Sequence, residues 1–169
     1  MKKDWERLES WLRTNDSETL AGLNPPATDA EIRDMERILG YGLPTGYVEC
    51  LKVHAGQKPM TKWLFGGDEF LSIQNVVINW EVWRDLLEGG DLVDGMPKSD
   101  VGVHSAWWSK SWVPFTANGR GDHLCLDMAP ASNGRVGQVI KVFHDSPERK
   151  LVAQDFASWF TAFVDNKIG

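Results

Sequence analysis

Cys125 lies between His123 and Asp127 in a segment that alternates polar and apolar residues. Such alternation is typical of a half-buried strand, so the thiol, the imidazole and the carboxylate should share one face of that strand. A cysteine nucleophile needs a base within hydrogen-bond reach, yet side chains two residues apart on a strand lie about 7 Å from one another. A cysteine-dependent hydrolase is therefore a minor alternative, which a buried and apolar Cys125 would exclude.

The other residues that could carry chemistry form no known motif. The sequence has no G-x-x-x-x-G-K-[ST] loop, no G-x-S-x-G elbow and no H-E-x-x-H helix. No two histidines are four residues apart, so we expect turn or surface histidines. They are His54, His104, His123 and His144. Asp122, Asp127 and Asp145 could approach one another and hold Ca²⁺, but their spacing does not match an EF-hand loop. We expect no catalytic residue, no cofactor and no metal.

The net charge points to a basic partner. The chain has 169 residues, with 18 Lys and Arg against 24 Asp and Glu, which gives a formal net charge of −6. Phosphate binding depends mainly on Lys and Arg, so this balance argues against nucleic acid and favours a basic protein. With 42% hydrophobic and 25% charged residues, the composition is that of a folded soluble domain.

The acidic residues are densest between positions 81 and 100. Glu81, Asp85 and Glu88 recur at i, i+4 and i+7, so they share one helix face, and Trp107 and Trp108 follow soon after. Tryptophans that stay exposed are good anchors, because tryptophan is enriched at interface hot spots. The alternative to a binding patch is that these acidic residues only form a solvated helix surface. The expected partner-binding residues are Glu81, Asp85, Glu88, Asp91, Asp94, Asp100, Trp107 and Trp108.

The two cysteines and the N-terminus indicate a cytoplasmic location. Cys50 and Cys125 are far apart and form no C-x-x-C pair, which favours reduced thiols in a cytosolic protein; a disulfide between them is the alternative. The first residues form a charged amphipathic pattern without the apolar region of a signal peptide. No uncharged apolar run reaches about 18 residues, the length that a membrane-spanning helix needs. We expect no membrane association.

Three helices are predicted before the first strand. Apolar residues at three-to-four-residue spacing predict a helix around residues 5–12. Thr28 and Glu31 supply the capping box of a second helix. Pro44 fits the first turn of a third, which should end at Gly56.

A hairpin and a long helix are expected next. Residues 63–71 read as two antiparallel strands joined at Gly66-Gly67. Ser72 is a candidate N-cap for a helix that ends near Gly90. Residues 91–105 show no period and predict a long loop.

The second half of the chain is predicted to be mainly strand. The expected strands lie around residues 112–115, 123–127, 136–143 and 151–153. Pro114 should lie at a sheet edge or bulge, where its missing N–H costs least. Asp155 can cap a last helix.

Several short motifs follow one another in a specific order. They are Leu43-Pro44, His54-Ala55-Gly56-Gln57, Phe65-Gly66-Gly67, Trp112-Val113-Pro114-Phe115, Asn118-Gly119, Gly121-Asp122, Leu124-Cys125-Leu126-Asp127, Pro130, Gly134, Gly137-Gln138-Val139, His144 and Phe156-Ala157-Ser158-Trp159-Phe160. Over about residues 20–165 this ordered set resembles the SUKH superfamily, and within it the group named after the yeast cell-wall assembly regulator of the Smi/Knr type.

The resemblance implies a single α+β domain over residues 1–169, with its core at about 20–165. N-terminal helices and a C-terminal helix would pack on a mainly antiparallel β-sheet, without enzymatic activity. Bacterial members of the family are immunity proteins that bind and neutralise a toxin domain, often a nuclease or deaminase, whereas eukaryotic relatives are regulatory interaction hubs. We therefore expect a cytosolic immunity protein that occludes a basic toxin, with a regulatory scaffold as the alternative.

The motif residues are expected to be structural. They include Pro44, Gly56, Gly66, Gly67, Trp112, Pro114, Gly119, Gly121, Asp122, Asp127 and Trp159. Gly46 stands where the family commonly has a polar or charged residue, and Asp155 replaces the usual serine, although aspartate caps a helix equally well. The toxin-contacting surface varies between members of the family, so the resemblance transfers no contact residue to this chain.

Overall fold

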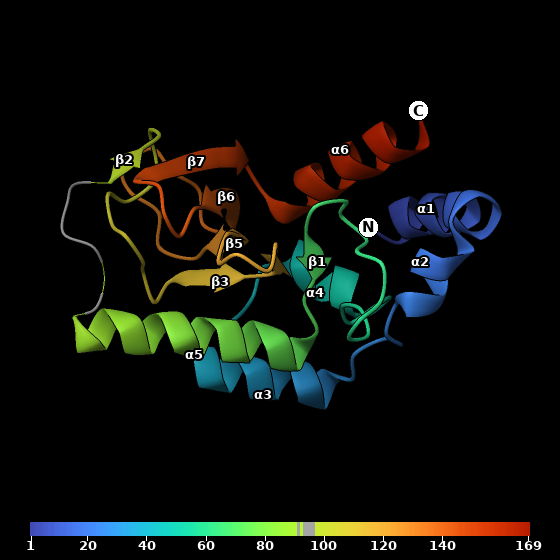
Figure 1. Cartoon of the computed structure of the whole chain (residues 1–169), viewed down its shortest axis with the longest axis horizontal. Helices are drawn as coiled ribbons and strands as arrows, with labels where there is room; N and C mark the ends of the chain where they lie inside the picture. Colours follow the sequence, from blue (N-terminus) through green and yellow to red (C-terminus); the bar gives the residue numbers. More distant parts are fainter. Residues whose placement is uncertain (91, 93–96) are drawn as a thin grey trace.

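A five-stranded sheet and the helices around it make up the fold (Figure 1). The computed structural model describes residues 1–90, 92 and 97–169. The helices are α1 (Lys2–Asn15), α2 (Ser17–Gly22), α3 (Asp29–Leu39), α4 (Thr45–Leu51), α5 (Ile73–Gly89) and α6 (Phe156–Ile168). The strands are β1 (Glu69–Phe70), β2 (Lys98–Ser99), β3 (Trp112–Pro114), β4 (Thr116–Ala117), β5 (His123–Asp127), β6 (Gln138–Val142) and β7 (Glu148–Ala153). The predicted α+β class is confirmed.

The main sheet has the order β2-β7-β6-β5-β3. Its pairs are antiparallel except β2, which runs parallel to β7, so the prediction of a mainly antiparallel sheet is confirmed. Pro114 lies on β3, an edge strand as predicted, where no further strand needs its N–H. The predicted loop at 91–105 is wrong in one respect, because Lys98 and Ser99 form β2, and the N–H of Lys98 donates to the carbonyl of Pro147 at 2.7 Å.

Helices α5 and α3 form one outer layer along the β3 side of the sheet (Figure 1). Both begin at the predicted caps. The Thr28 hydroxyl accepts the N–H of Glu31, whose carboxylate accepts the N–H of Thr28 in return. The Ser72 hydroxyl accepts the N–H of Asn75, and Gly90, at φ 75°, ends α5. Strong local capping signals therefore locate this layer correctly.

The N-terminal part has one more helix than predicted. Within residues 1–68, all of which the structure describes, four helices precede β1 instead of three. The additional α2 is capped by Asp16, whose carboxylate accepts hydrogen bonds from the N–H and hydroxyl of Thr19. Helix α4 ends at Leu51, so Gly56 is a turn residue instead of its last one. At φ 81°, Gly56 lies so close to the Leu71 carbonyl that a Cβ would collide with it.

The hairpin predicted for residues 63–71 is wrong. Strand β1 pairs with β4, and residues 63–65 form no strand. The buried side chain of Gln57 takes the place of a partner strand, since its Oε1 accepts the backbone N–H of Leu64 at 3.1 Å and of Phe70 at 2.9 Å. One long-range side chain thereby satisfies two backbone donors that a hairpin would otherwise pair.

Strand β5 is buried on both faces, whereas half burial was predicted. His123 is 2% exposed and Cys125 and Asp127 are 0% exposed. The rings of Trp83 and Trp108 lie edge-on to His123, at centroid distances of 6.2 and 6.4 Å, and cover the face that should have met solvent. The polar residues of this strand are therefore part of the core.

Candidate functional site

The outer face of α5 carries the acidic residues on which the predicted interface depends. Glu81, Asp85 and Glu88 have side chains 43%, 67% and 53% exposed. The guanidinium of Arg84 donates to Asp85 at 2.8 and 3.0 Å and lies 3.7 Å from Glu81, while the Lys110 ammonium pairs with Glu88. Two cations thus partly neutralise three carboxylates, so the face is less negative than the sequence alone predicts.

The predicted acidic stretch does not form one patch within the described residues. Asp100 follows β2, which lies at the opposite edge of the sheet from β3 and α5. Its carboxylate accepts the backbone N–H of Leu151 at 2.9 Å, which ties β2 to β7. Asp91 and Asp94 lie outside the described residues. Of the predicted acidic residues that the structure describes, only Glu81, Asp85 and Glu88 therefore share one surface.

Trp108 is not an exposed anchor. It is 2% exposed and stacks on Trp83 with ring centroids 5.0 Å apart, while Trp112 meets it edge-on at 5.8 Å. Trp107 is half-buried, and the Arg149 guanidinium lies 5.1 Å from the centre of its ring. Trp108 therefore helps to hold α5 and β3 together and is unable to contact a partner, whereas Trp107 packs against Arg149 of β7.

Arg149 is a buried residue that sequence reasoning missed. Its guanidinium is surrounded by carbonyls, with bonds of 2.7 to 3.2 Å to Ser146, Glu148, Ala106 and Trp107. Burial lowers the pKa of Arg149 to about 10. The side chain joins the turn before β7 to the segment before β3, and nothing in the local sequence distinguishes it from a surface arginine.

The burial of strand β5 argues against a cysteine-dependent hydrolase. Cys125 is fully buried, which raises the pKa of its thiol well above the usual value, so the nucleophilic thiolate is suppressed. The His123 ring is committed elsewhere, because its Nδ1 lies 2.7 Å from the carbonyl of Thr116, and burial lowers its pKa. Cys50 is also buried, and neither cysteine is in a disulfide.

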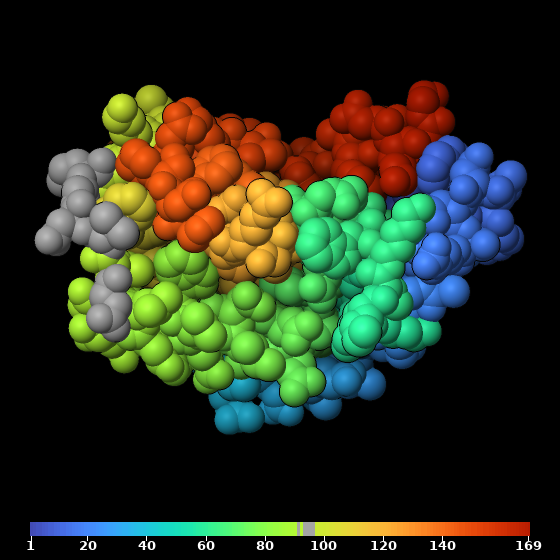
Figure 2. Space-filling model, in the orientation of Figure 1, coloured from blue at the N-terminus to red at the C-terminus, as the bar shows by residue number. Residues whose placement is uncertain are grey.

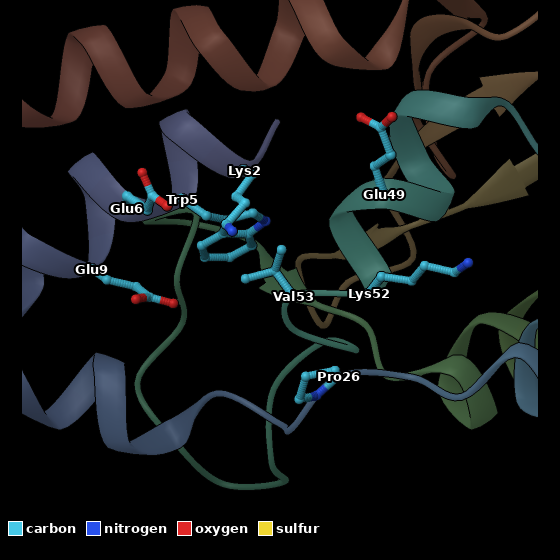
Figure 3. Close-up of a pocket in the computed structure, with 8 residues that line it drawn as sticks. All are labelled: Lys2, Trp5, Glu6, Glu9, Pro26, Glu49, Lys52 and Val53. Carbon is cyan, nitrogen blue, oxygen red and sulfur yellow. The ribbon is translucent and has the colours of Figure 1, made fainter.

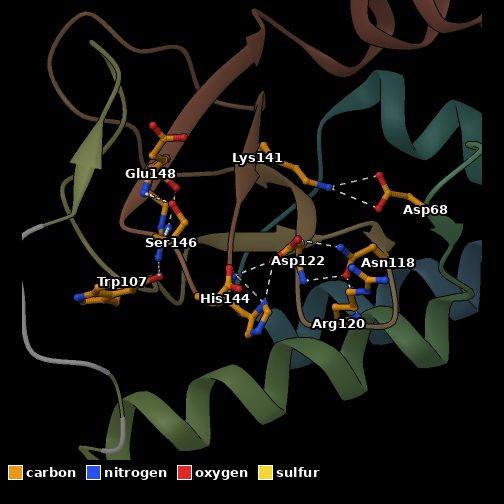
Figure 4. A network of polar contacts seen from close by, with 11 residues as sticks. Asp68, Trp107, Asn118, Arg120, Asp122, Lys141, His144, Ser146 and Glu148 are labelled. Carbon is orange, nitrogen blue, oxygen red and sulfur yellow. Dashed lines mark hydrogen bonds and ion pairs between the residues drawn. The ribbon is translucent and has the colours of Figure 1, made fainter.

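Asp122, His144 and Asp145 form the one grouping of acidic and histidine side chains among the described residues with the spacing of a metal site. Both oxygens of Asp122 are already hydrogen-bonded: Oδ1 accepts the backbone N–H of His144 at 2.9 Å, and Oδ2 accepts Asn118 at 2.8 Å (Figure 4). Asp127 is not part of the group, since its Oδ2 accepts Gln138 at 2.9 Å inside the sheet. The group therefore holds two turns together.

A pocket of about 700 Å³ opens beside α1 and α4 (Figure 3). Its lining residues are Lys2, Trp5, Glu6, Glu9, Pro26, Glu49, Lys52 and Val53. Two of the charged groups are already paired: Lys52 lies 2.7 Å from Asp29, and Glu9 lies 2.8 Å from His54. The described lining includes no cysteine, serine or histidine, so it holds no pair of the Cys–His or Ser–His kind.

Three exposed aliphatic residues lie close together on the outer layer. Ile38 on α3 and Ile78 and Val82 on α5 are 42 to 53% exposed. Large aliphatic side chains that cluster in this way, next to charged ones, are typical of a protein-binding surface. The outer layer is therefore the candidate site.

Comparison with known proteins identifies the family. The model of the SMI1/KNR4 family (SUKH-1) matches residues 26–162. The chain belongs to this family. It is 20% identical to the cell wall assembly regulator SMI1 of Saccharomyces cerevisiae, over 96% of this chain and 39% of that protein. It is 28% identical to the cell wall biosynthesis/cell cycle regulator smi1 of Schizosaccharomyces pombe, over 97% of this chain and 35% of that protein.

The SUKH-1 match covers only part of these relatives. The chain spans about a third to two fifths of their length, including the glucan synthesis regulatory protein of Neurospora crassa, to which it is 20% identical over 96% of this chain and 37% of that protein. Among the described residues, no helix of this SUKH-1 chain combines the length and apolar character that crossing a bilayer requires.

The motif residues of the SUKH-1 chain lie mainly at turns and in the core. Gly121 has φ 95°, and a Cβ there would lie 2.9 Å from that of His144. Trp112 is fully buried, and Trp159 packs on Phe65 and Phe115 at centroid distances of 5.0 and 4.9 Å. Pro44 precedes α4, and Gly66, Gly67 and Gly119 lie in turns. None of these residues belongs to the outer layer.

Proposed function

We propose that this SUKH-1 chain is a non-catalytic protein-binding domain that neutralises a basic bacterial toxin domain by covering it. The observation that carries the proposal is the outer layer, where exposed aliphatic side chains lie beside the carboxylates of Glu81 and Asp85. Aliphatic contacts supply affinity, and the carboxylates attract a partner of opposite charge. The net charge of −6 supports a basic partner.

The burial of Cys125 and the commitment of the His123 ring to Thr116 are in keeping with a binding role. The Cys125 thiol is inaccessible, and the pocket beside α1 and α4 contains only lysine, glutamate, tryptophan, proline and valine. Two unpaired, buried cysteines suit a reducing compartment, so we place the interaction in the cytoplasm.

A regulatory scaffold is the second candidate. The printed names of the fungal relatives, which describe regulators of cell-wall assembly and glucan synthesis, favour it. A scaffold would bind several proteins without neutralising any of them, whereas an immunity protein binds one toxin tightly. The two candidates therefore differ in the number of partners and in the effect of binding.

The proposal can be tested in two steps. The tagged chain is purified from its native cells, and each bound protein is then expressed with and without the chain. We expect one partner with a basic binding domain that arrests growth alone, is tolerated when the chain is co-expressed, and forms a complex of defined stoichiometry by light scattering. Several partners, none of which arrests growth, would support the scaffold. A partner that arrests growth equally with and without the chain would refute neutralisation.

A further inference from the structure

Three exposed aliphatic side chains of the outer layer lie in or next to one groove, and we call them the apolar strip. Ile38 is 42% exposed, Ile78 46% and Val82 53%. Ile38 and Ile78 line the same groove of about 340 Å³ between α3 and α5, and Val82 lies one helical turn beyond Ile78 on the same side of α5. Figure 2 shows α3 and α5 side by side on the lower surface of the molecule.

The groove has an apolar floor and an acidic rim. Met35, Ile73 and Val77 complete the apolar part of the lining, and Gln74 is its one uncharged polar residue. Glu31 and Asp34 line the rim from α3. Further along α5, Glu81 and Asp85 continue it with side chains 43% and 67% exposed.

The rim keeps an excess of negative charge. Arg37 pairs with Asp34 at 3.0 Å, and Arg84 pairs with Asp85 at 2.8 Å, so two guanidiniums stand against four carboxylates. The capping bonds from the backbone and hydroxyl of Thr28 lower the pKa of Glu31, which keeps that carboxylate charged near neutral pH. An apolar partner without basic residues would leave these charges poorly solvated.

We propose that this groove docks one amphipathic, basic helix of the partner. The inference rests on the proposed function and names the surface and the chemistry of the partner. A groove between two helices suits a third helix whose aliphatic residues recur at i, i+3, i+4 and i+7, with Lys or Arg on both flanks. The stretch of α5 from Ile73 to Val82 is about 14 Å long, which matches between two and three turns of such a helix. A second copy of this chain would bring the same carboxylates into contact, so self-association through this face is disfavoured.

A synthetic helical peptide of about 18 residues, with leucine at i, i+3, i+4 and i+7 and lysine on both flanks, is the probe. Its affinity is measured by calorimetry for the wild type and for the triple variant Ile38→Ser, Ile78→Ser, Val82→Ser. We expect saturable binding that the triple variant weakens about tenfold or more. The matched control is the double variant Val101→Ser, Val136→Ser, which removes side chains that are 78% and 62% exposed elsewhere and should bind within about twofold of the wild type.

Two further peptides separate charge from shape. Replacing the leucines of the peptide by glutamine keeps its charge but removes its apolar face, and this should abolish binding. Replacing the lysines by glutamate keeps the apolar face but reverses the charge, and this should also abolish binding. Circular dichroism of each protein variant shows whether it is folded; these sites are exposed, so all should be. Equal affinity of the wild type and the folded triple variant, or of the leucine and glutamine peptides, would overturn the groove assignment.

A neutralisation assay with the purified partner distinguishes failure of this inference from failure of the proposed function. If the triple variant neutralises the purified partner as well as the wild type does, the groove assignment fails and the binding function stands. If the wild type neutralises no partner while the peptide binds the groove as described, the proposed function fails and the docking site stands.

Discussion

Trp83 and Trp108 stack face to face, with ring centroids 5.0 Å apart and ring planes inclined by 15°. The contact joins the middle of α5 to the segment before β3, and Trp80 strengthens it by donating its indole N–H to the carbonyl of Lys110 at 2.9 Å. The inner side of α5 is thereby fixed on the sheet. Its outer side, with the apolar strip and the acidic rim, is presented by a rigid support, which lowers the entropic cost of binding.

Replacing Trp108 by alanine should strongly destabilise the protein. The side chain is 2% exposed, and its loss leaves a cavity between α5 and β3 that the surroundings fill only in part. We expect the free energy of unfolding, measured in urea, to fall by about 3–5 kcal/mol. Val82→Ala on the exposed side of the same helix should change it by less than about 0.5 kcal/mol. Similar values for the two variants would contradict the stacked arrangement.

Arg149 should contribute to stability through its carbonyl contacts. Arg149→Met leaves four carbonyls without this donor, and Arg149→Lys supplies a single ammonium that is unable to reach them all. Each change should lower the free energy of unfolding by about 2–4 kcal/mol. Arg120→Met, at an exposed arginine, should have little effect. A methionine variant as stable as the wild type would show that the contacts contribute nothing net.

The two cysteines should be unreactive in the folded protein. Burial raises the pKa of the Cys50 and Cys125 thiols, so little thiolate forms at about pH 8, and reagents have no access to either sulfur. Iodoacetamide should label neither residue in buffer and both in guanidinium chloride, as measured by mass spectrometry. Rapid labelling of Cys125 in buffer would reopen the possibility of a cysteine nucleophile.

Asp122 should make stability depend on pH in the acid range. Partial burial raises its pKa, but hydrogen bonds from the backbone and ring of His144 and from Asn118 outweigh that effect and lower it overall. A carboxyl with a lowered pKa in the folded state stabilises the protein above its unfolded pKa of about 4, and the contribution is lost as the pH falls through the folded value.

The variant Asp122→Ala measures this contribution. It should lower the free energy of unfolding by about 1–2 kcal/mol at neutral pH, and by progressively less below about pH 4. Asp145→Ala removes a neighbouring carboxylate that is 73% exposed, and it should have little effect at any pH. A loss for Asp122→Ala that stays constant with pH would assign the effect to packing.

Local signals predicted most of the helices correctly. The capping residues Thr28, Ser72 and Asp155 each act on a backbone N–H three residues ahead, so the sequence alone contains the whole interaction. The pairing of β1 with β4 was missed, because it joins residues more than 45 positions apart, and so was the side chain of Gln57, which reaches Phe70 thirteen residues away. Interactions of that kind leave no periodic pattern.

The candidate site was predictable only in part. The spacing of Glu81, Asp85 and Glu88 correctly put three carboxylates on α5, but the Lys110 that pairs with Glu88 is 22 residues away and could not be assigned from the sequence. The exposure of Ile38 was not predictable, because its spacing with Ile32, Met35 and Leu39 predicts a buried helix face. Ile78, in contrast, lies outside the apolar stripe of α5, which agrees with its exposure. Only the crossing of α3 and α5 determines which apolar residues remain at the surface.

The association rate of the chain with its purified partner tests the central claim most directly. The triple variant Glu81→Lys, Asp85→Lys, Glu88→Lys reverses the charge of the α5 face without touching the core. At low salt we predict that it associates at least about tenfold more slowly than the wild type, and that the difference shrinks as the salt concentration rises. Equal association rates and equal salt dependence for the two proteins would contradict docking of a basic partner on the outer layer.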